Sequence, residues 1–72
     1  TDDHQQQLDI ADAILQIDDL HETGIQMKIK TLIQVGNHGM ALSVYEDFCA
    51  RYQTLYGEEF PHSFKEISEK SR

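Results

Sequence analysis

The segment 38–56 constrains the fold of this chain more than any other, because its apolar residues recur with the period of an α-helix. On a helical projection they form one wide arc: Ala41, Tyr45, Phe48, Tyr52 and Leu55, widened by Leu42, Val44, Cys49 and Tyr56. Gly36 precedes the segment and Gly57 follows it, as is typical of helix ends. An arc of this width needs neighbours on more than one flank. It predicts a helix at the centre of a helical array, with Ala41 where two helices approach closely.

Two helices are predicted before this segment. The second of them, about 20–35, presents an apolar face made of Ile25, Ile29, Leu32 and Ile33. Asp19 and Glu22 have the spacing of a capping box at its start, and Gly36 is placed to end it. Gly24 lies in its first turns, where it lowers helix stability, and is expected to let another backbone approach closely.

The first helix, about 3–17, carries two apolar stripes side by side. The first stripe consists of Leu8, Ala11 and Leu15. The second consists of Ile10, Ile14 and Ile17. One stripe fits against the second helix, so the other is left without an obvious neighbour within the chain.

A short helix, about 62–70, is predicted last, with Pro61 at its start. Its Phe64 and Ile67 are expected to pack back together with Phe60. No stretch shows strand-like alternation. The sequence therefore predicts an all-α chain of four antiparallel helices joined by short turns.

Thirteen acidic and six basic residues give the chain a formal net charge of −7. Affinity for nucleic acid comes mainly from lysine and arginine contacts to phosphate. The basic residues are dispersed along the sequence: Lys28, Lys30, Arg51, Lys65, Lys70 and Arg72. Direct contact of this chain with DNA is therefore not expected.

The residue types that carry catalysis or metal binding lack the spacing that such sites need. The four histidines (His4, His21, His38 and His62) fall near successive helix starts, so at most two share one end of an antiparallel bundle. A closed zinc site needs four ligands. No phosphate-binding glycine-rich loop, nucleophile elbow or HExxH motif occurs. The sequence predicts no enzyme, cofactor, metal or small-molecule ligand.

The cysteine content and the lengths of the apolar runs bear on location. Cys49 is the single cysteine, which excludes an internal disulfide and suits a reducing compartment, so we expect a cytoplasmic protein. Its place on an apolar face favours a buried thiol over a nucleophile. No apolar run has membrane-spanning length. The chain starts at Thr1 without an initiator methionine, and we expect residues 1–72 to be a single domain excised from a larger protein.

The helix pair 20–35 and 38–56 has the organisation of a tetratricopeptide repeat, whose period is about 34 residues. When a repeat begins at Glu22, its small-residue and aromatic positions fall on Ala41 and Tyr45. One period earlier, the same two positions fall on Gln7 and Ala11, so the first repeat matches the pattern only partly. The expected array is therefore tetratricopeptide-like.

Several motifs resemble the bacterial transcriptional activator domain, a tetratricopeptide-like helical family. They are Ile17-Asp18-Asp19-Leu20-His21-Glu22, Gly36-Asn37, Ala41-Leu42-x-x-Tyr45-x-x-Phe48, and Leu55-Tyr56-Gly57 with Pro61 and Ile67 beyond. The loop before Pro61 is one residue longer than the family pattern, and Phe60 stands where an acid usually precedes the proline. The family occurs in bacterial regulators beside a winged-helix DNA-binding domain. The resemblance therefore implies protein contact and no catalytic or cofactor residues.

Three functions follow as hypotheses. The first is a protein–protein interaction or oligomerisation domain of a bacterial transcriptional regulator, which reaches DNA only through another domain of the parent. The alternative is a tetratricopeptide-type scaffold or adaptor fragment that binds a peptide or protein partner outside transcription. An accessory domain of an enzyme is the third.

The second stripe of the first helix predicts where a protein partner binds. If the other stripe faces the second helix, Ile10, Ile14 and Ile17 point toward a helix that this chain does not supply. Burying each of these side chains contributes about 1.5–3 kcal/mol. We expect the chain to self-associate through this stripe, and an upstream helix to cover it in the intact parent. In the alternative arrangement, the short last helix tucks inward and hides the stripe within one chain.

Overall fold

The helix α2 (Glu22–Gln34) is the one against which all the others pack. The computed structural model describes residues 2–70, including the side chains of residues 3–69. Within that range α1 (Asp2–Ile17), α2, α3 (His38–Tyr56) and α4 (Phe64–Lys70) follow one another, and no strand occurs. The all-α prediction with four helices is confirmed, and the bounds of α3 are those expected from the sequence.

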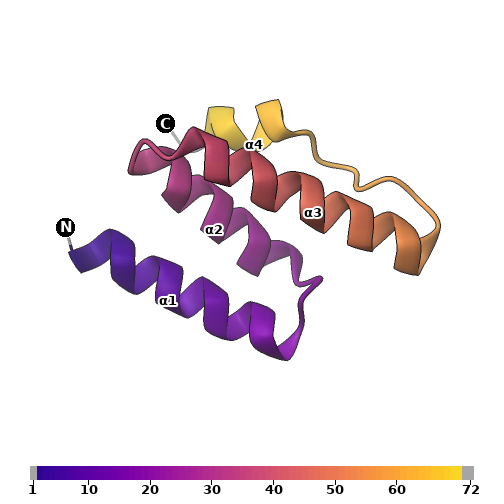
Figure 1. Ribbon diagram of the computed structural model, residues 1–72, viewed down its shortest axis with the longest axis horizontal. Helices are drawn as coiled ribbons and strands as arrows, with labels where there is room; N and C mark the ends of the chain where they lie inside the picture. Colours follow the sequence, from indigo (N-terminus) through magenta and orange to yellow (C-terminus); the bar gives the residue numbers. More distant parts are fainter. Residues whose placement is uncertain (1, 71–72) are drawn as a thin grey trace.

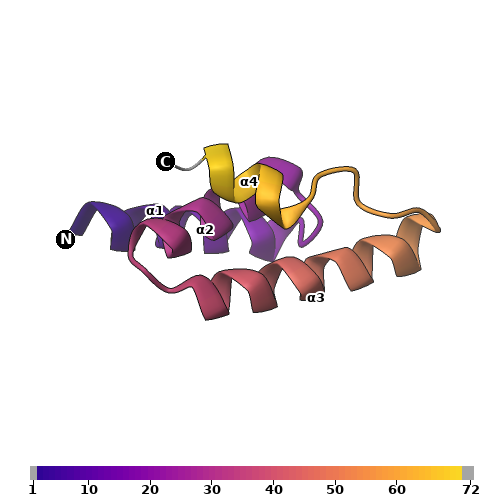
Figure 2. The same cartoon turned by 90° about the horizontal axis from the view of Figure 1, so that it is seen from above.

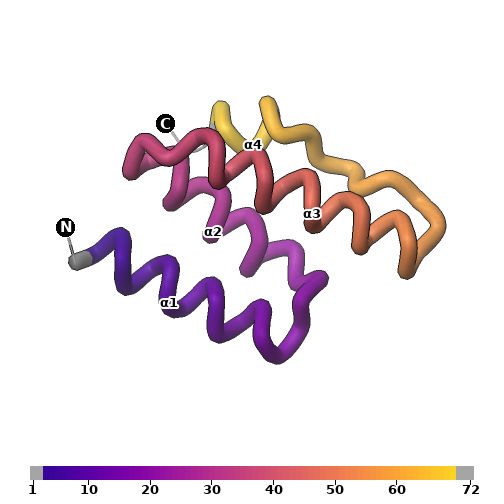
Figure 3. The backbone as a smooth tube through the Cα atoms, viewed as in Figure 1, coloured from indigo at the N-terminus to yellow at the C-terminus, as the bar shows by residue number. Residues whose placement is uncertain are grey.

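The expectation that the segment 38–56 is the centre of the array is wrong. In Figure 1, α2 lies between α1 and α3, and the tube in Figure 3 follows the same order. Seen from above (Figure 2), α3 and α4 approach α2 from different sides. α3 is longer than α2, with 19 residues against 13, and its last turns extend past the start of α2. Part of its apolar arc is consequently uncovered, and Leu55 is 66% exposed.

The hydrophobic core draws on all four helices and on the loop before α4. Its buried side chains are Ala11, Ile25, Ile29, Leu32, Ala41, Phe48, Phe60 and Ile67. Ala41 is fully buried, in agreement with the expected close approach of two helices. Phe64 packs against the same core as Phe60 and Ile67, which confirms the predicted packing of the last helix. None of the helices in the described range is long and apolar enough to cross a membrane.

The start of α2 differs from the predicted capping box. The Gly24 N–H donates to Nδ1 of His21 at 3.0 Å, so His21 is the N-cap and the helix begins at Glu22, two residues later than expected. Asp18 Oδ1 accepts the N–H of Leu20 at 3.1 Å and tightens the preceding turn. Asp19 takes no part in the cap, because its carboxylate pairs with a cation of α3.

The ends of α2 and α3 are the ones that their glycines predict. Gly36 has a φ of +85°, and its N–H donates to the carbonyl of Ile33 at 3.0 Å. The Asn37 N–H donates to the carbonyl of Leu32 at 2.8 Å, which completes a Schellman motif. Gly57 ends α3 in the same left-handed region, with a φ of +71°. Both positions are unfavourable for residues with a Cβ atom.

The last helix begins at Phe64, so the predicted range 62–70 starts two residues too early. The side-chain oxygen of Ser63 accepts the N–H of Glu66 at 3.1 Å, as an N-cap serine does. Pro61 therefore lies in the loop before the helix rather than in its first turn. Ser63 and Glu66 have the spacing of a capping box, so Ser63 rather than Pro61 marks the start of α4.

Candidate functional site

The outer side of α1 exposes two of the three isoleucines that the sequence singles out. Ile10 is 49% exposed and Ile17 is 91% exposed. Ile14 is half-buried, because it lies over Gly24 of α2. The expected stripe is therefore divided, with Ile14 in the α1–α2 contact and its two neighbours facing away from the core. α4 packs on α2 and leaves Ile10 and Ile17 exposed, unlike the alternative in which it hides them.

The division of the stripe follows from how closely α1 and α2 approach. A Cβ atom on Gly24 would lie 2.9 Å from Ile14 Cγ2 and 3.4 Å from Leu15 Cδ2. Carbon atoms prefer separations of about 3.5–4.0 Å, so glycine alone fits without a shift. Gly24 does admit a close neighbour, as expected, but the atoms that meet it are side-chain atoms of α1 rather than another backbone.

A groove of about 410 Å³ lies between α1 and α2 beside Ile10. We call it the α1–α2 groove, and its lining residues are Gln7, Ile10, Thr23, Gln26, Met27, Lys30, Thr31 and Gln34. Lys30 is the one charged residue among them. Ile17 follows Ile10 by two turns on the same side of α1 and continues its apolar surface beyond the groove. The groove is thus apolar and amide-lined, in a chain that is rich in charge.

Thr31 connects the two walls of the α1–α2 groove. It is buried, and its hydroxyl donates to the carbonyl of Met27 at 2.8 Å. The same hydroxyl lies 3.2 Å from Oε1 of Gln7 on α1. This polar contact between facing helices holds α1 and α2 in one register.

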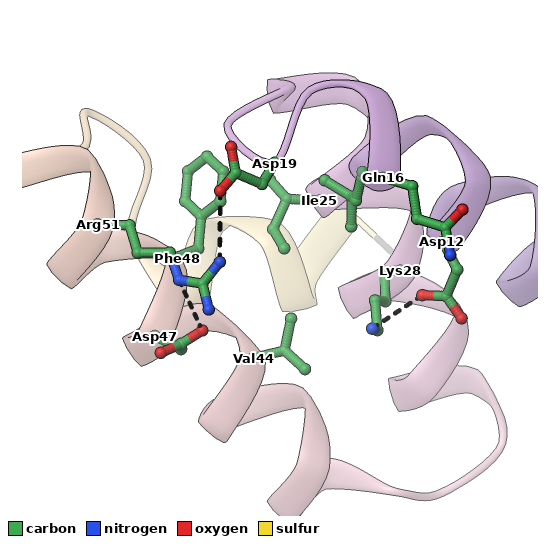
Figure 4. A pocket seen from close by; sticks show the side chains of 10 residues that line it. Asp12, Gln16, Asp19, Ile25, Lys28, Val44, Asp47, Phe48 and Arg51 are labelled. Carbon is green, nitrogen blue, oxygen red and sulfur yellow. Dashed lines mark hydrogen bonds and ion pairs between the residues drawn. The ribbon is translucent and has the colours of Figure 1, made fainter. Parts of the chain in front are cut away.

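A second groove, of about 480 Å³, lies among α1, α2 and α3 and is lined with ion pairs (Figure 4). Lys28 Nζ lies 2.9 Å from Oδ1 of Asp12. Arg51 lies 3.4 Å from Asp19 and 3.2 Å from Asp47, which is four residues earlier on the same helix. Each cation of this ion-paired groove already has an aspartate, so a charged ligand would have to displace one.

An aromatic cluster attaches the loop before α4 to α3. Phe60 packs edge-on against Phe48, with ring centroids 4.9 Å apart, and against Tyr52 at 5.3 Å. The Tyr45 hydroxyl donates to the carbonyl of His62 at 2.8 Å. Burial raises the pKa of Tyr45 to about 12, and the neighbouring Cys49 thiol makes a smaller contribution in the same direction. These contacts give the cluster a structural role, since they join two segments of the chain.

The histidines and the cysteine have separate surroundings. His21 caps α2, and Nδ1 of His62 lies 2.8 Å from the carboxylate of Glu66 within α4. Cys49 is a half-buried free thiol on α3. Among the residues that the structure describes, no group of three or more histidine, cysteine or acidic side chains is placed to hold a metal ion.

No protein-family model, curated protein or solved structure matches this chain. Function therefore has to be inferred from the surfaces themselves. Sequence patterns identified the α1 wall of the α1–α2 groove through Ile10, but they gave its α2 wall no role. The signal for that wall is the helical spacing of Thr23, Met27, Lys30 and Gln34, which places these residues along one side of α2.

Proposed function

We propose that this chain is a protein–protein interaction domain, and that its partner binds the α1–α2 groove and the adjoining surface of Ile10, Ile14 and Ile17. The observation that carries the proposal is the exposed isoleucine pair beside a groove with one charged residue. Contiguous exposed apolar surface on a small domain usually marks a contact site. The cores of protein interfaces are also depleted of charged residues.

The choice between the two grooves rests on charge. The ion-paired groove has five charged residues in its lining, Asp12, Asp19, Lys28, Asp47 and Arg51, and its cations are neutralised internally. A partner binding there would desolvate several charges, and this cost often exceeds the Coulombic gain. A partner that binds the α1–α2 groove would desolvate one charged residue of the lining, Lys30. An apolar helix face is the better fit to such a surface.

We further propose that the parent protein is a bacterial transcriptional regulator of the cytoplasm, and that this domain contributes contact with protein rather than with DNA. The resemblance of the α2–α3 segment to the activator-domain family supports this, as does the net charge of −7, which disfavours phosphate backbones. The packing of α1, α3 and α4 on α2 supports a tetratricopeptide-like array. No catalytic step is assigned to the domain.

Site-specific photocrosslinking in the native host tests the contact surface. A photoreactive amino acid at position 17 is expected to crosslink to protein, whereas the same amino acid at the exposed position 43 on α3 is expected not to. Absence of any protein crosslink at position 17 would contradict the proposed contact surface.

Reading the complete parent gene tests the link to transcription. A winged-helix segment upstream of these residues is expected. Further helical repeats on both sides, without a DNA-binding segment, would instead favour the scaffold or adaptor.

A further inference from the structure

Two side chains of opposite charge, one in the α1–α2 groove and one at the end of α1, have no ion-pair partner within the described part of the chain. Lys30 is half-buried in the groove, whereas Lys28 and Arg51 are both paired with aspartates. Asp18 follows α1 directly and accepts the N–H of Leu20 at 3.1 Å, but no cation is paired with it. In a chain with more than twice as many acids as bases, an unpaired groove lysine fits a partner that supplies an acid.

The contacts between α1 and α2 fix the position of Lys30 along α1. Thr31 lies beside Gln7, with 3.2 Å between Oγ1 and Oε1. The two helices are consecutive and antiparallel (Figure 1). The residue before Thr31 is therefore level with the residue after Gln7, which places Lys30 level with Leu8.

The exposed surface of α1 is self-complementary when two copies of the helix run antiparallel. If Ile10 of one copy lies opposite Ile17 of the second copy, twofold symmetry also places Ile17 of the first copy opposite Ile10 of the second. No other antiparallel register gives both exposed isoleucines an isoleucine neighbour. The same register sets Leu8, and with it Lys30, beside the turn that begins at Asp18 of the second copy.

We propose that a second copy of this chain is the occupant of the α1–α2 groove. The two α1 helices pack antiparallel with Ile10 against Ile17, and Lys30 of each copy pairs with Asp18 of the other. This inference rests on the proposed function, because it names the partner of the same surface. The groove lining carries no acid, whereas α1 itself carries acids and no lysine or arginine. Repulsion between the two α1 helices is screened only beyond about 8 Å at physiological salt, and the two pairs between Lys30 and Asp18 oppose it.

Sedimentation equilibrium of the 72-residue chain at one fixed salt concentration tests the apolar part of the contact. The wild type is expected to dimerise, and Ile17→Asp to raise the dimer Kd at least about 10-fold, since the symmetric dimer contains the change twice. Ile17 is so exposed that this substitution leaves the core intact. Leu55→Asp, which alters an exposed leucine on α3, is the matched control and is expected to leave Kd unchanged.

A charge exchange tests the register. Lys30→Glu and Asp18→Lys are each expected to raise Kd about 10-fold, because each change brings like charges together twice in the dimer. The double variant is expected to return Kd to within about threefold of the wild type. Lys65→Glu makes the same change in net charge on the exposed side of α4 and is the control for general repulsion.

The outcomes separate this proposal from the proposed function. A wild type that stays monomeric would overturn the second copy as partner, while a crosslink from position 17 to a different protein would leave the contact surface standing. A dimer that tolerates Ile17→Asp would overturn the proposal as well. Failure of the charge exchange to restore association in a folded double variant would overturn the register.

Discussion

The close approach of α1 and α2 at Gly24 makes a substitution there a sensitive test of the structure. Gly24→Ala replaces a poor helix residue with the best one, which by itself stabilises a helix by about 0.5–1 kcal/mol. The new Cβ atom would, however, lie 2.9 Å from Ile14 Cγ2, well inside van der Waals contact. Ile14 is β-branched and held in one rotamer within a helix. The methyl group has no room to swing aside, so α1 itself must move.

The magnitude follows from comparison with a second glycine. Overpacking typically costs about 1–3 kcal/mol. Gly39 also lies in the first turn of its helix and has no atom within 4 Å of an added Cβ, so Gly39→Ala gains helix propensity without a clash. The difference between the two alanine variants isolates the overpacking. Gly24→Ala is expected to be less stable than Gly39→Ala by about 1–3 kcal/mol, and each kcal/mol shifts the Tm by about 4–8 °C in a domain of this size.

Urea and thermal unfolding followed by circular dichroism measure this difference. Ile14→Leu serves as the second background in which Gly24→Ala is measured, because leucine has the volume of isoleucine and lacks the Cγ2 methyl group. In that background Gly24→Ala is expected to become as favourable as Gly39→Ala, giving a coupling of about 1–3 kcal/mol between the two sites. If Gly24→Ala stabilised the wild-type chain as much as Gly39→Ala, the described α1–α2 contact would be refuted.

Three further predictions concern the core, the aromatic cluster and nucleic acid. Ala41→Leu is expected to cost about 1–3 kcal/mol by overpacking a fully buried site, and an unchanged Tm would contradict that packing. The pKa of an unfolded tyrosine is near 10 and that of folded Tyr45 is about 12, so the folded state holds the phenol proton more tightly. The free energy of unfolding that Tyr45 contributes is therefore fully present below pH 10 and is lost as the pH rises from 10 to 12. Tyr45→Phe is expected to lose less stability over that range in urea titrations, and an equal loss would assign the effect to other groups. Titration against random duplex DNA at low salt is expected to show no binding at about micromolar concentration. Binding at or below that concentration would contradict the proposal that this domain contacts protein rather than DNA.

The helices and most of their ends could be predicted from the sequence, because they depend on neighbouring residues. The apolar period of the segment 38–56 reports a helix wherever that helix is placed. Gly36 and Gly57 end their helices because the left-handed conformation required there is inexpensive for glycine. The exposure of Ile10 and Ile17 agrees with one of the two arrangements that the sequence left open, in which a single neighbouring helix covers one stripe of α1 and leaves the next one uncovered.

The tertiary structure decided which of several possible partners each residue takes. Asp19 has the spacing of a local cap, yet it pairs with Arg51, which lies far along the sequence and close in space. Ile14 belongs to the same stripe as Ile10, but Gly24 lets α1 approach so closely that Ile14 is drawn into the contact. The central helix of the array is α2 rather than α3 for a related reason. Burial depends on how near the neighbouring backbones come, and helical periodicity reports the direction of a side chain without reporting that distance.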